Sequence, residues 1–366
     1  MKFAILTHPF KGNYGGMLQA WALQKVFSVL HVESYVVAYH QPMEWFWKSL
    51  ERILHCGRNL FLWWLPYHKK LVVYRHLLSK MGEAFLRNHI RSVDEYEAKG
   101  RDWTWVLGSE QVWRCIAARR HRNVPFFFLA ELPEDVRCRS FSYAASFATA
   151  EWEGTAAETV QCTQLLREFK SVSVREYSGV RICRDVFGVN ARQMPDAALL
   201  LKAADYDQII EPDTVLPKGD YLAAYLLDGE RQALALCSQI VENTGEELVH
   251  LMPSSSHFTH PLSVSRWLAY IKNCKALITD SFHGCVFAIL YNKPFVCMGS
   301  HFRGMERFKT LLEIFQLEHC LLLEPSAEQV EKLLKTPIDW EKVNTIADSE
   351  RERGLDYIKN SVGAVL

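Results

Sequence analysis

The sequence predicts an α/β protein with two Rossmann-like domains that face each other across a cleft. Three observations lead to this prediction. Short apolar runs alternate with stretches of helical period in both halves of the chain. Residues 203–220, which are rich in Asp, Pro and Gly, separate the two halves. The length of 366 residues is also typical of about two domains.

The first domain, predicted at residues 1–205, begins with a βαβ unit. Residues 3–7 favour a strand, residues 17–30 carry apolar side chains at helical spacing, and residues 32–39 favour a second strand. A crossover of this kind pairs its two strands in parallel. Further strands are expected at residues 105–107, 140–144 and 172–174.

The second domain, predicted at residues 218–335, repeats the alternation. Charged residues of helical pattern follow it, so that residues 340–366 are expected to form a C-terminal helix. The strands are expected at residues 221–227, 247–252, 276–279 and 295–298, with helices at 232–242, 263–274 and 285–291.

Composition limits the function classes. A formal net charge of zero argues against a nucleic-acid partner, because such proteins usually carry a basic excess. The N-terminus lacks the pattern of a signal peptide, and no apolar run is long enough to span a bilayer. Ten scattered cysteines are typical of a reducing compartment. We therefore expect a cytoplasmic protein.

Residues 42–80 differ from the rest of the first domain. They are rich in aromatic residues, including Trp63 and Trp64, and in Lys and Arg, whereas Glu44 and Glu51 are their only acidic residues. This composition suits a peripheral contact with an anionic membrane. The alternative is a helical insertion that packs on its own domain and leaves a solvated basic face.

The sharpest functional signal is the turn after residues 276–279. Ser281, His283 and Gly284 lie between a strand pattern and an apolar helical run, which places His283 at a helix N-terminus. Anionic ligands bind at such positions in open α/β sheets. A histidine there can also transfer a proton near neutral pH, so we predict that His283 is catalytic.

Polar residues also follow two predicted strands of the first domain. One group joins residues 3–7 to a helix, and its glycines let a ligand approach closely; a simple tight turn is the alternative. The other group follows residues 105–107, where an N-cap at Ser109 is the alternative. We expect both groups to contact a substrate: Asn13, Tyr14 and Gly15 in the first, and Ser109, Glu110 and Gln111 in the second.

Three arginines are candidates for binding an anion. Arg175 ends the strand at residues 172–174, where it either binds an anion or pairs with Glu176 or Asp196. Arg303 and Arg307 begin a helix, and their charge opposes the helix dipole unless a bound anion offsets it.

Together these segments resemble the polysaccharide pyruvyl transferase family, and the motifs occur in the family's order. The chain departs from the family pattern at Glu110, which replaces an Asp, at Arg114, which replaces an Asn, and at Ala148, which replaces a Gly. The matching motifs are residues 13–24 (NYGGMLQAWALQ), 108–113 (GSEQVW), 142–147 (SYAASF), 173–176 (SVRE) with Ser178 and Gly179, Asp196, 279–284 (TDSFHG) and Arg307.

The resemblance implies a GT-B-like fold. It also implies transfer of a carboxyethylidene group from phosphoenolpyruvate, a co-substrate, to two hydroxyls of a sugar in a bacterial capsule, exopolysaccharide or cell-wall glycan, or in its lipid-linked precursor. The products are a pyruvate ketal and free phosphate, and no metal or other cofactor is expected. The reaction would take place in the cytoplasm or on the inner face of the membrane.

The resemblance and the residues together assign roles. His283 would protonate the vinyl carbon of phosphoenolpyruvate, and the loops of the first domain would bind the acceptor. The alternatives are a GT-B-type glycosyltransferase that uses a sugar nucleotide and a non-catalytic protein of glycan assembly. Donor binding is assigned to Arg175, Ser281, Gly284, Arg303 and Arg307, and acceptor binding to Asn13, Tyr14, Gly15, Ser109, Glu110 and Gln111.

Overall fold

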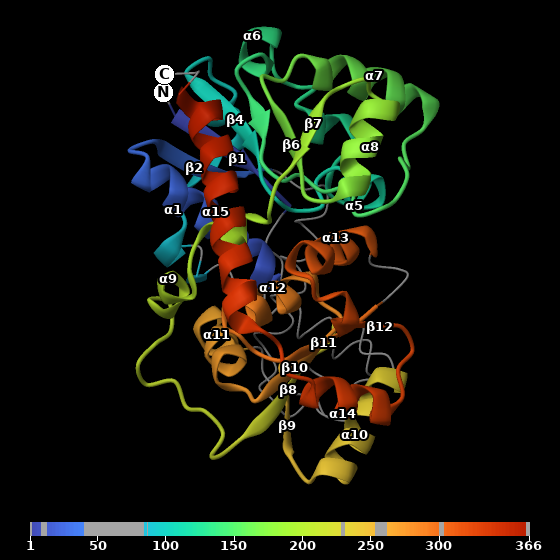
Figure 1. Cartoon of the computed structure of the whole chain (residues 1–366). Coiled ribbons are helices and arrows are strands. Elements are labelled where there is room, and N and C mark those ends of the chain that lie inside the picture. Colours follow the sequence, from blue (N-terminus) through green and yellow to red (C-terminus); the bar gives the residue numbers. More distant parts are fainter. Residues whose placement is uncertain are drawn as a thin grey trace, which may run out of the picture.

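The structure, a computed structural model, places one parallel sheet at the centre of each of two domains (Figure 1). The insertion predicted at residues 42–80 and the side chain of Arg303 lie outside the described residues. The described residues are 2–8, 13–39, 84–85, 87–227, 231–252, 262–299 and 304–363.

The sheet of the first domain has the strand order β3-β2-β1-β4-β5, and all of its strands are parallel. Single bridges from Phe141 to Ser171 and from Ala145 to Val174 continue it into the β6–β7 pair. The order reverses direction between β1 and β4. The strands are β1 Lys2–Leu6, β2 Glu33–Ala38, β3 Ser92–Asp94, β4 Trp103–Leu107, β5 Phe141–Ser142, β6 Val172–Val174 and β7 Ala191–Gln193.

The sheet of the second domain has the order β12-β11-β10-β8-β9 and is also parallel. Its order reverses between β8 and β10. In open parallel sheets, ligands bind outside the carboxyl ends of the strands at such a reversal. The strands are β8 Tyr221–Tyr225, β9 Glu247–His250, β10 Ala276–Thr279, β11 Phe295–Met298 and β12 Leu321–Leu322.

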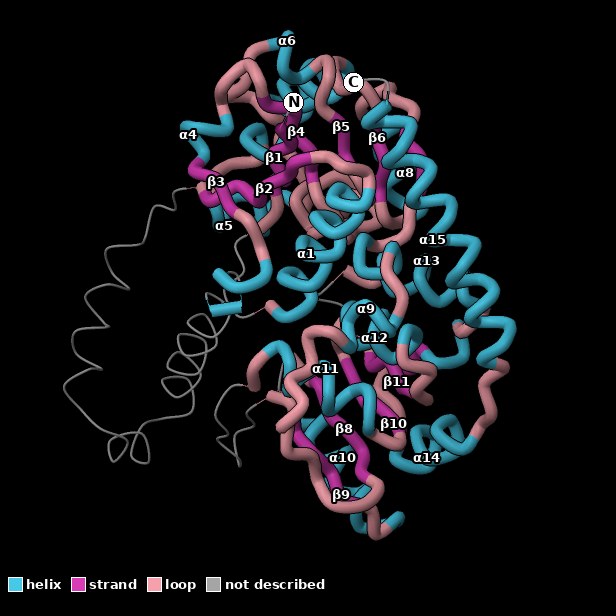
Figure 2. The backbone as a smooth tube through the Cα atoms, turned by 90° about the vertical axis from the view of Figure 1, so that its left-hand side faces the viewer, coloured by secondary structure: helices cyan, strands magenta, loops and turns pink. Residues whose placement is uncertain are grey.

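Helices flank both sheets (Figure 2). In the first domain they are α1 Tyr14–Val29, α4 Glu95–Ala98, α5 Cys115–His121, α6 Glu134–Arg137, α7 Ala156–Arg167 and α8 Tyr177–Asp185. In the second they are α10 Arg231–Thr244, α11 Val264–Asn273, α12 Phe282–Leu290, α13 Glu306–Phe315 and α14 Ala327–Lys335, and α9 Ala203–Asp207 lies between the domains.

The last helix, α15 Trp340–Gly363, runs from the second domain back along the first, so that the two ends of the chain lie close together (Figure 1). The hydroxyl of Tyr357 donates to the carbonyl of Ser142 at 3.0 Å, which holds the helix against the end of β5. The second domain is therefore attached to the first by two chain connections.

The interface between the domains is an aromatic core. The ring of Tyr14, in the first turn of α1, stacks on Trp267 of α11 with the centroids 5.2 Å apart. The hydroxyl of Tyr14 donates to the carbonyl of Leu262 at 2.6 Å. Tyr206 packs edge-on against Phe287 of α12 at 4.9 Å. Because close-packed interiors resist sliding, these contacts fix how the two sheets face each other.

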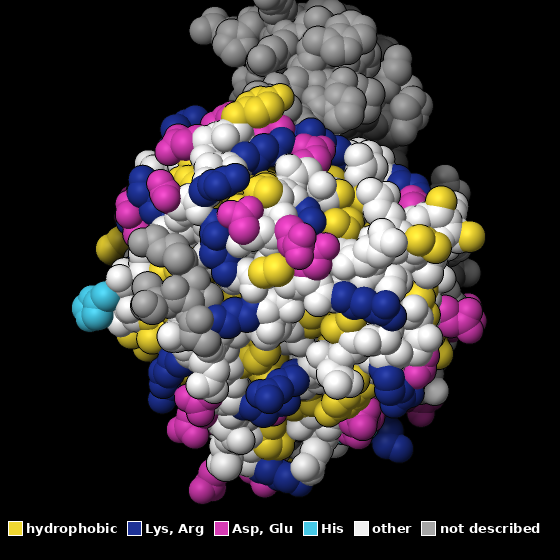
Figure 3. Space-filling model, turned by 90° about the horizontal axis from the view of Figure 1, so that it is seen from above, with side chains coloured by type: hydrophobic (Ala, Val, Ile, Leu, Met, Phe, Trp, Pro, Cys, Tyr) yellow, Lys and Arg dark blue, Asp and Glu magenta, His cyan; other side chains and the backbone are white. Residues whose placement is uncertain are grey.

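The described surface is mixed in charge. Acidic and basic side chains are interspersed on the face seen from above (Figure 3), which agrees with the formal net charge of zero. Among the described helices, none combines the length and the apolar character needed to cross a membrane.

We predict that Tyr14→Phe lowers the free energy of unfolding by about 1 kcal/mol, because the partly buried carbonyl of Leu262 loses its donor while the ring stack remains. Urea denaturation measures the change. The control is Tyr177→Phe, a half-exposed tyrosine of α8, which should stay within about 0.5 kcal/mol of the parent. Equal stability of Tyr14→Phe and the parent would contradict the interdomain role.

Candidate active site

Polar side chains gather where the two sheets reverse their strand order. His8 follows β1 in the chain and Ser109 and Glu110 follow β4, whereas Ser281 and His283 follow β10. The first turns of α1 and α12 meet here. A Cβ atom on Gly15 would lie 2.0 Å from Cγ of His283, so only a glycine leaves room for the histidine ring. α12 begins at Phe282, directly after its N-cap Ser281, which confirms the predicted placement of His283 at a helix N-terminus.

Both helix starts are capped by side chains. Asn13 accepts the N–H of Gly16 at 3.0 Å and donates to Oε2 of Glu110 at 3.1 Å. Ser281 accepts the N–H of Gly284 at 3.3 Å. A Cβ atom on Gly284 would approach Oγ1 of Thr279 to 2.3 Å. Ser281 and Gly284 therefore shape the start of α12, and these contacts alone place no ligand there.

The carboxylate of Asp196 contacts residues from both domains. Its Oδ2 accepts from Nη1 of Arg175 at 2.6 Å and from Oγ of Ser109 at 3.2 Å. Nε2 of His283 lies 3.6 Å from the same oxygen, which is an ion-pair distance but too long for a hydrogen bond. Burial alone would raise the pKa of Asp196, but the nearby His283 and Arg175 outweigh it and hold the pKa well below its usual range.

Only some of the hydrogen-bond donors of Arg175 have partners among the described residues. Its Nη1 donates to the carbonyl of Ser109 and to Asp196, both at 2.6 Å. Its Nε and Nη2 have no hydrogen-bond partner among the described residues, although the side chain is 2% exposed. The guanidinium carbon lies 4.3 Å from the centre of the Phe282 ring, and that of Arg307 lies 5.4 Å from the same ring. Two cations thus flank one aromatic ring.

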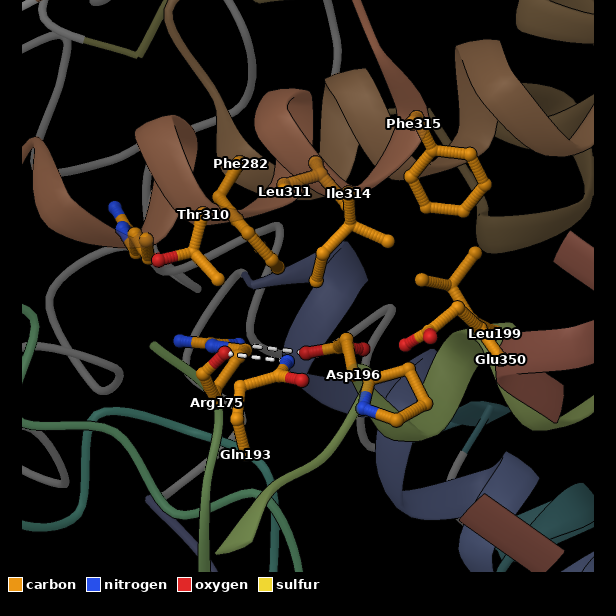
Figure 4. Close-up of a pocket in the computed structure, with 12 residues that line it drawn as sticks. Arg175, Gln193, Asp196, Leu199, Phe282, Thr310, Leu311, Ile314, Phe315 and Glu350 are labelled. Atoms are coloured by element: carbon orange, nitrogen blue, oxygen red, sulfur yellow. Dashed lines mark hydrogen bonds and ion pairs between the residues drawn. The ribbon is translucent and has the colours of Figure 1, made fainter. Parts of the chain in front are cut away.

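A pocket opens beside these cations (Figure 4). In this view Arg175 and Asp196 point toward each other, and Leu311 and Ile314 of α13 lie across from them. The wall therefore combines buried charge with apolar surface, as ligand pockets commonly do. The lining residues are Arg175, Gln193, Pro195, Asp196, Leu199, Phe282, Arg307, Thr310, Leu311, Ile314, Phe315 and Glu350.

Glu110 interacts electrostatically with two histidines. Burial would raise the pKa of Glu110, but His283, Arg175 and His8 together lower it, so that the carboxyl stays ionised near neutral pH. On its other side, Nε2 of His8 lies 2.8 Å from the carbonyl oxygen of Gln111. Burial lowers the pKa of His8 despite the opposing charge of Glu110.

The structure brings together most of the residues predicted to form the site and separates a few. Asn13, Gly15, Ser109 and Glu110 lie beside Arg175, Arg307 and His283, whereas Tyr14 belongs to the aromatic interface. The carbonyl oxygen of Gln111 accepts a hydrogen bond from His8. Its side-chain oxygen accepts one from Nη1 of Arg114 at 3.2 Å.

The N-cap alternative for Ser109 is wrong. The following helix, α5, begins at Cys115, and Ser109 is fully buried, with its hydroxyl bonded to Asp196 and to Gln19. Of the two pairing partners named for Arg175, Asp196 is the one that the structure shows. Glu176 instead accepts the N–H groups of Phe147 and Ala148.

Sequence reasoning missed two contributors, His8 and Phe282, whose ring contacts both arginines. It named Asp196 as a possible partner of Arg175 but not as an acceptor shared with Ser109. The position of His8 directly after a predicted strand was a usable signal, whereas the roles of Phe282 and Asp196 depend on contacts between distant segments. Within the part of the chain that the structure describes, no three His, Cys, Asp or Glu side chains are placed to hold a metal ion.

Comparisons with known proteins agree with this architecture. A family model described as polysaccharide pyruvyl transferase matches residues 13–301. No curated protein matches the chain in sequence. A structure of MnaA with UDP from S. aureus is 12% identical, with a TM-score of 0.51 and coverage of 99% of this chain and 96% of that chain. UDP-GlcNAc 2-epimerase from Neisseria meningitidis, bound to UDP-GlcNAc, is 10% identical, with a TM-score of 0.51 and 99% coverage of both chains.

At such identities the likeness shows the fold alone. It confirms the predicted pair of Rossmann-like domains in a GT-B-like arrangement.

We predict that Asp196→Asn lowers the free energy of unfolding at pH 7 by about 3–5 kcal/mol, because the buried guanidinium of Arg175 loses its counter-charge. Because folding lowers the pKa of Asp196, its stabilisation is present above about pH 4 and is lost as the pH falls further. The difference between parent and variant should therefore shrink from about pH 5 to pH 3.

Urea denaturation at several pH values measures this. Asp185→Asn is the control, because it breaks an exposed ion pair with Arg184 and should alter stability little at any pH. A gap between parent and Asp196→Asn that stays constant down to pH 3 would show that the carboxylate is not held ionised by its neighbours.

Proposed function

The chain belongs to the polysaccharide pyruvyl transferase family, and we propose that it moves the carboxyethylidene group of phosphoenolpyruvate onto two hydroxyls of a sugar, with release of phosphate. The acceptor is a bacterial surface polysaccharide or its lipid-linked precursor. The observation that carries the proposal is the buried guanidinium of Arg175, which keeps two donors without a partner beside a pocket.

The geometry of Arg175 supports the proposed binding of phosphoenolpyruvate. Nε and Nη2 form the side-on edge of the guanidinium, which binds a carboxylate or phosphate through two parallel hydrogen bonds. Asp196 holds the opposite corner of the group and so orients the open edge. Arg307, on the same aromatic ring, supplies a second positive charge. Phosphoenolpyruvate carries two anionic groups and therefore matches a pair of cations.

His283 is proposed to supply the proton. Protonation of the vinyl methylene carbon makes the neighbouring carbon oxocarbenium-like, and a sugar hydroxyl can then attack it. The bond to phosphate breaks, and the second hydroxyl closes the ketal ring. Asp196, 3.6 Å from Nε2, orients the imidazole, and such contacts commonly tighten when substrate binds.

The acceptor is proposed to lie on the side of the first domain. Glu110 is held ionised, and one of its carboxylate oxygens is fixed by Asn13. An ionised carboxylate at that position can accept hydrogen bonds from sugar hydroxyls and orient both of them.

The decisive experiment measures phosphate release from phosphoenolpyruvate with lipid-linked or synthetic galactosides, glucosides and N-acetylhexosamines, and identifies the ketal by mass spectrometry. At least one acceptor should yield both products. A thermal-shift panel runs in parallel, and we expect stabilisation by phosphoenolpyruvate. Stabilisation by nucleoside diphosphates instead, with no phosphate release, would favour a sugar-nucleotide transferase and overturn the proposal.

We predict that His283→Ala lowers the turnover number by a factor of about 10²–10⁴, the usual contribution of a positioned acid. The variant should still fold, because the change removes one side chain from a helix start that Ser281 caps. Circular dichroism checks the fold, and the phosphate-release assay checks the rate. Near-normal turnover in the folded variant would remove His283 from the chemistry.

We predict that Arg175→Lys weakens phosphoenolpyruvate binding by about 10- to 100-fold, because an ammonium group keeps the charge beside Asp196 but loses the bidentate edge. Isothermal titration calorimetry measures the dissociation constant. The control is Arg184→Lys, which is exposed and paired with Asp185 and should bind as the parent does. An unchanged dissociation constant in Arg175→Lys would show that the donor binds elsewhere.

A further inference from the structure

The proposed reaction, on which this inference depends, must remove protons from two hydroxyls. One proton ends on the methyl carbon of the ketal and the other on the released phosphate. His283 gives up a proton at the start, and the proton of the hydroxyl that closes the ring must restore it. The proton of the attacking hydroxyl ends on phosphate, and a second group near the acceptor, already in its basic form, can carry it there.

His8 has the properties of such a group. A carbonyl oxygen only accepts hydrogen bonds, so the 2.8 Å contact with Gln111 places the ring hydrogen on Nε2 of His8. Nδ1 then carries the lone pair. That nitrogen is buried and has no hydrogen-bond partner among the described residues, although a buried acceptor usually finds one.

The surroundings of His8 keep it neutral. Burial lowers its pKa, and Glu110 opposes this only in part, so that the imidazole is unprotonated near pH 7. Among the described residues, the charged and titratable groups that face it are Glu110, which follows β4, and His121 of α5, whose ring centre is 4.7 Å away. The ring also packs edge-on against Phe127 at 5.0 Å, which fixes its orientation.

The position of His8 in the fold also suits a residue of the site. His8 follows β1, and Glu110 follows β4, so both lie where the first sheet reverses its strand order. Glu110 interacts electrostatically with His8 and with His283. One carboxylate thus interacts with both histidines, each of which lies at the strand reversal of a different domain.

We infer that His8 is the general base of the acceptor side: its Nδ1 takes the proton of the sugar hydroxyl that attacks. In that step a lone pair of the hydroxyl oxygen forms the bond to the central carbon of the donor, and the O–H electron pair remains on that oxygen. The proton moves to Nδ1, giving an imidazolium. The leaving phosphate then takes this proton as its bond to carbon breaks, which restores neutral His8 for the next turnover. The second hydroxyl closes the ketal ring, and its proton goes to His283, which restores the acid.

His8→Gln separates this role from simple packing. The amide nitrogen of glutamine can still donate to the carbonyl of Gln111, but the variant has no basic nitrogen in place of Nδ1. We expect kcat/KM for the acceptor to fall by about 10²–10⁴, with an unchanged dissociation constant for phosphoenolpyruvate and an unchanged melting temperature. The control, His121→Gln, removes the neighbouring imidazole and should keep the parent's activity.

The pH profile gives a second readout that needs no variant. For the parent, kcat/KM should fall on the acid side with a midpoint below the ordinary histidine value of about 6.5, and His8→Gln should lack that fall. Parent-like kcat/KM in His8→Gln, or a parent profile without the acid fall, overturns the assignment of His8 alone. A parent enzyme that releases no phosphate with any acceptor overturns the proposed function instead.

Discussion

The buried carboxylate of Asp196 is the constraint on which the site depends. A charge removed from water is tolerated only when partners satisfy it, and here the partners come from three separate parts of the chain. Ser109 follows β4, Arg175 follows β6, and His283 begins α12 in the other domain. Satisfying this one group therefore brings the ends of both sheets together and leaves Nε and Nη2 of Arg175 without a partner among the described residues.

Close approach of the two domains is the second requirement. Gly15 lets the His283 ring rest against α1, and a Cβ atom on Gly304 would lie 2.2 Å from the carbonyl oxygen of Ala148. Ala148 itself adopts a φ of +64°, a conformation that favours glycine, which is the residue that the family pattern has there. The aromatic interface around Tyr14 holds this spacing, so packing next to Asn13 and Gly15 sets the distance between the two proposed substrate sides.

The two histidines of the site differ in their surroundings. His283 faces an ionised carboxylate, whereas His8 is buried against Phe127 and bonded to a backbone carbonyl. Different surroundings are a common way for one site to hold both an acid and a base. The proposed division of roles between the domains rests on what each sheet places at its strand reversal.

The order of strands and helices was determined by the sequence, because apolar periodicity and capping residues act over a few positions. β6, β10 and β11 match the predicted ranges, and α12 starts at the cap that places His283. The short edge strands β3, β7 and β12, the choice of Asp196 over Glu176 as the partner of Arg175, and the packing of Tyr14 between the domains were decided only by the tertiary structure. Each of these depends on contacts between residues far apart in the chain, which no local pattern encodes.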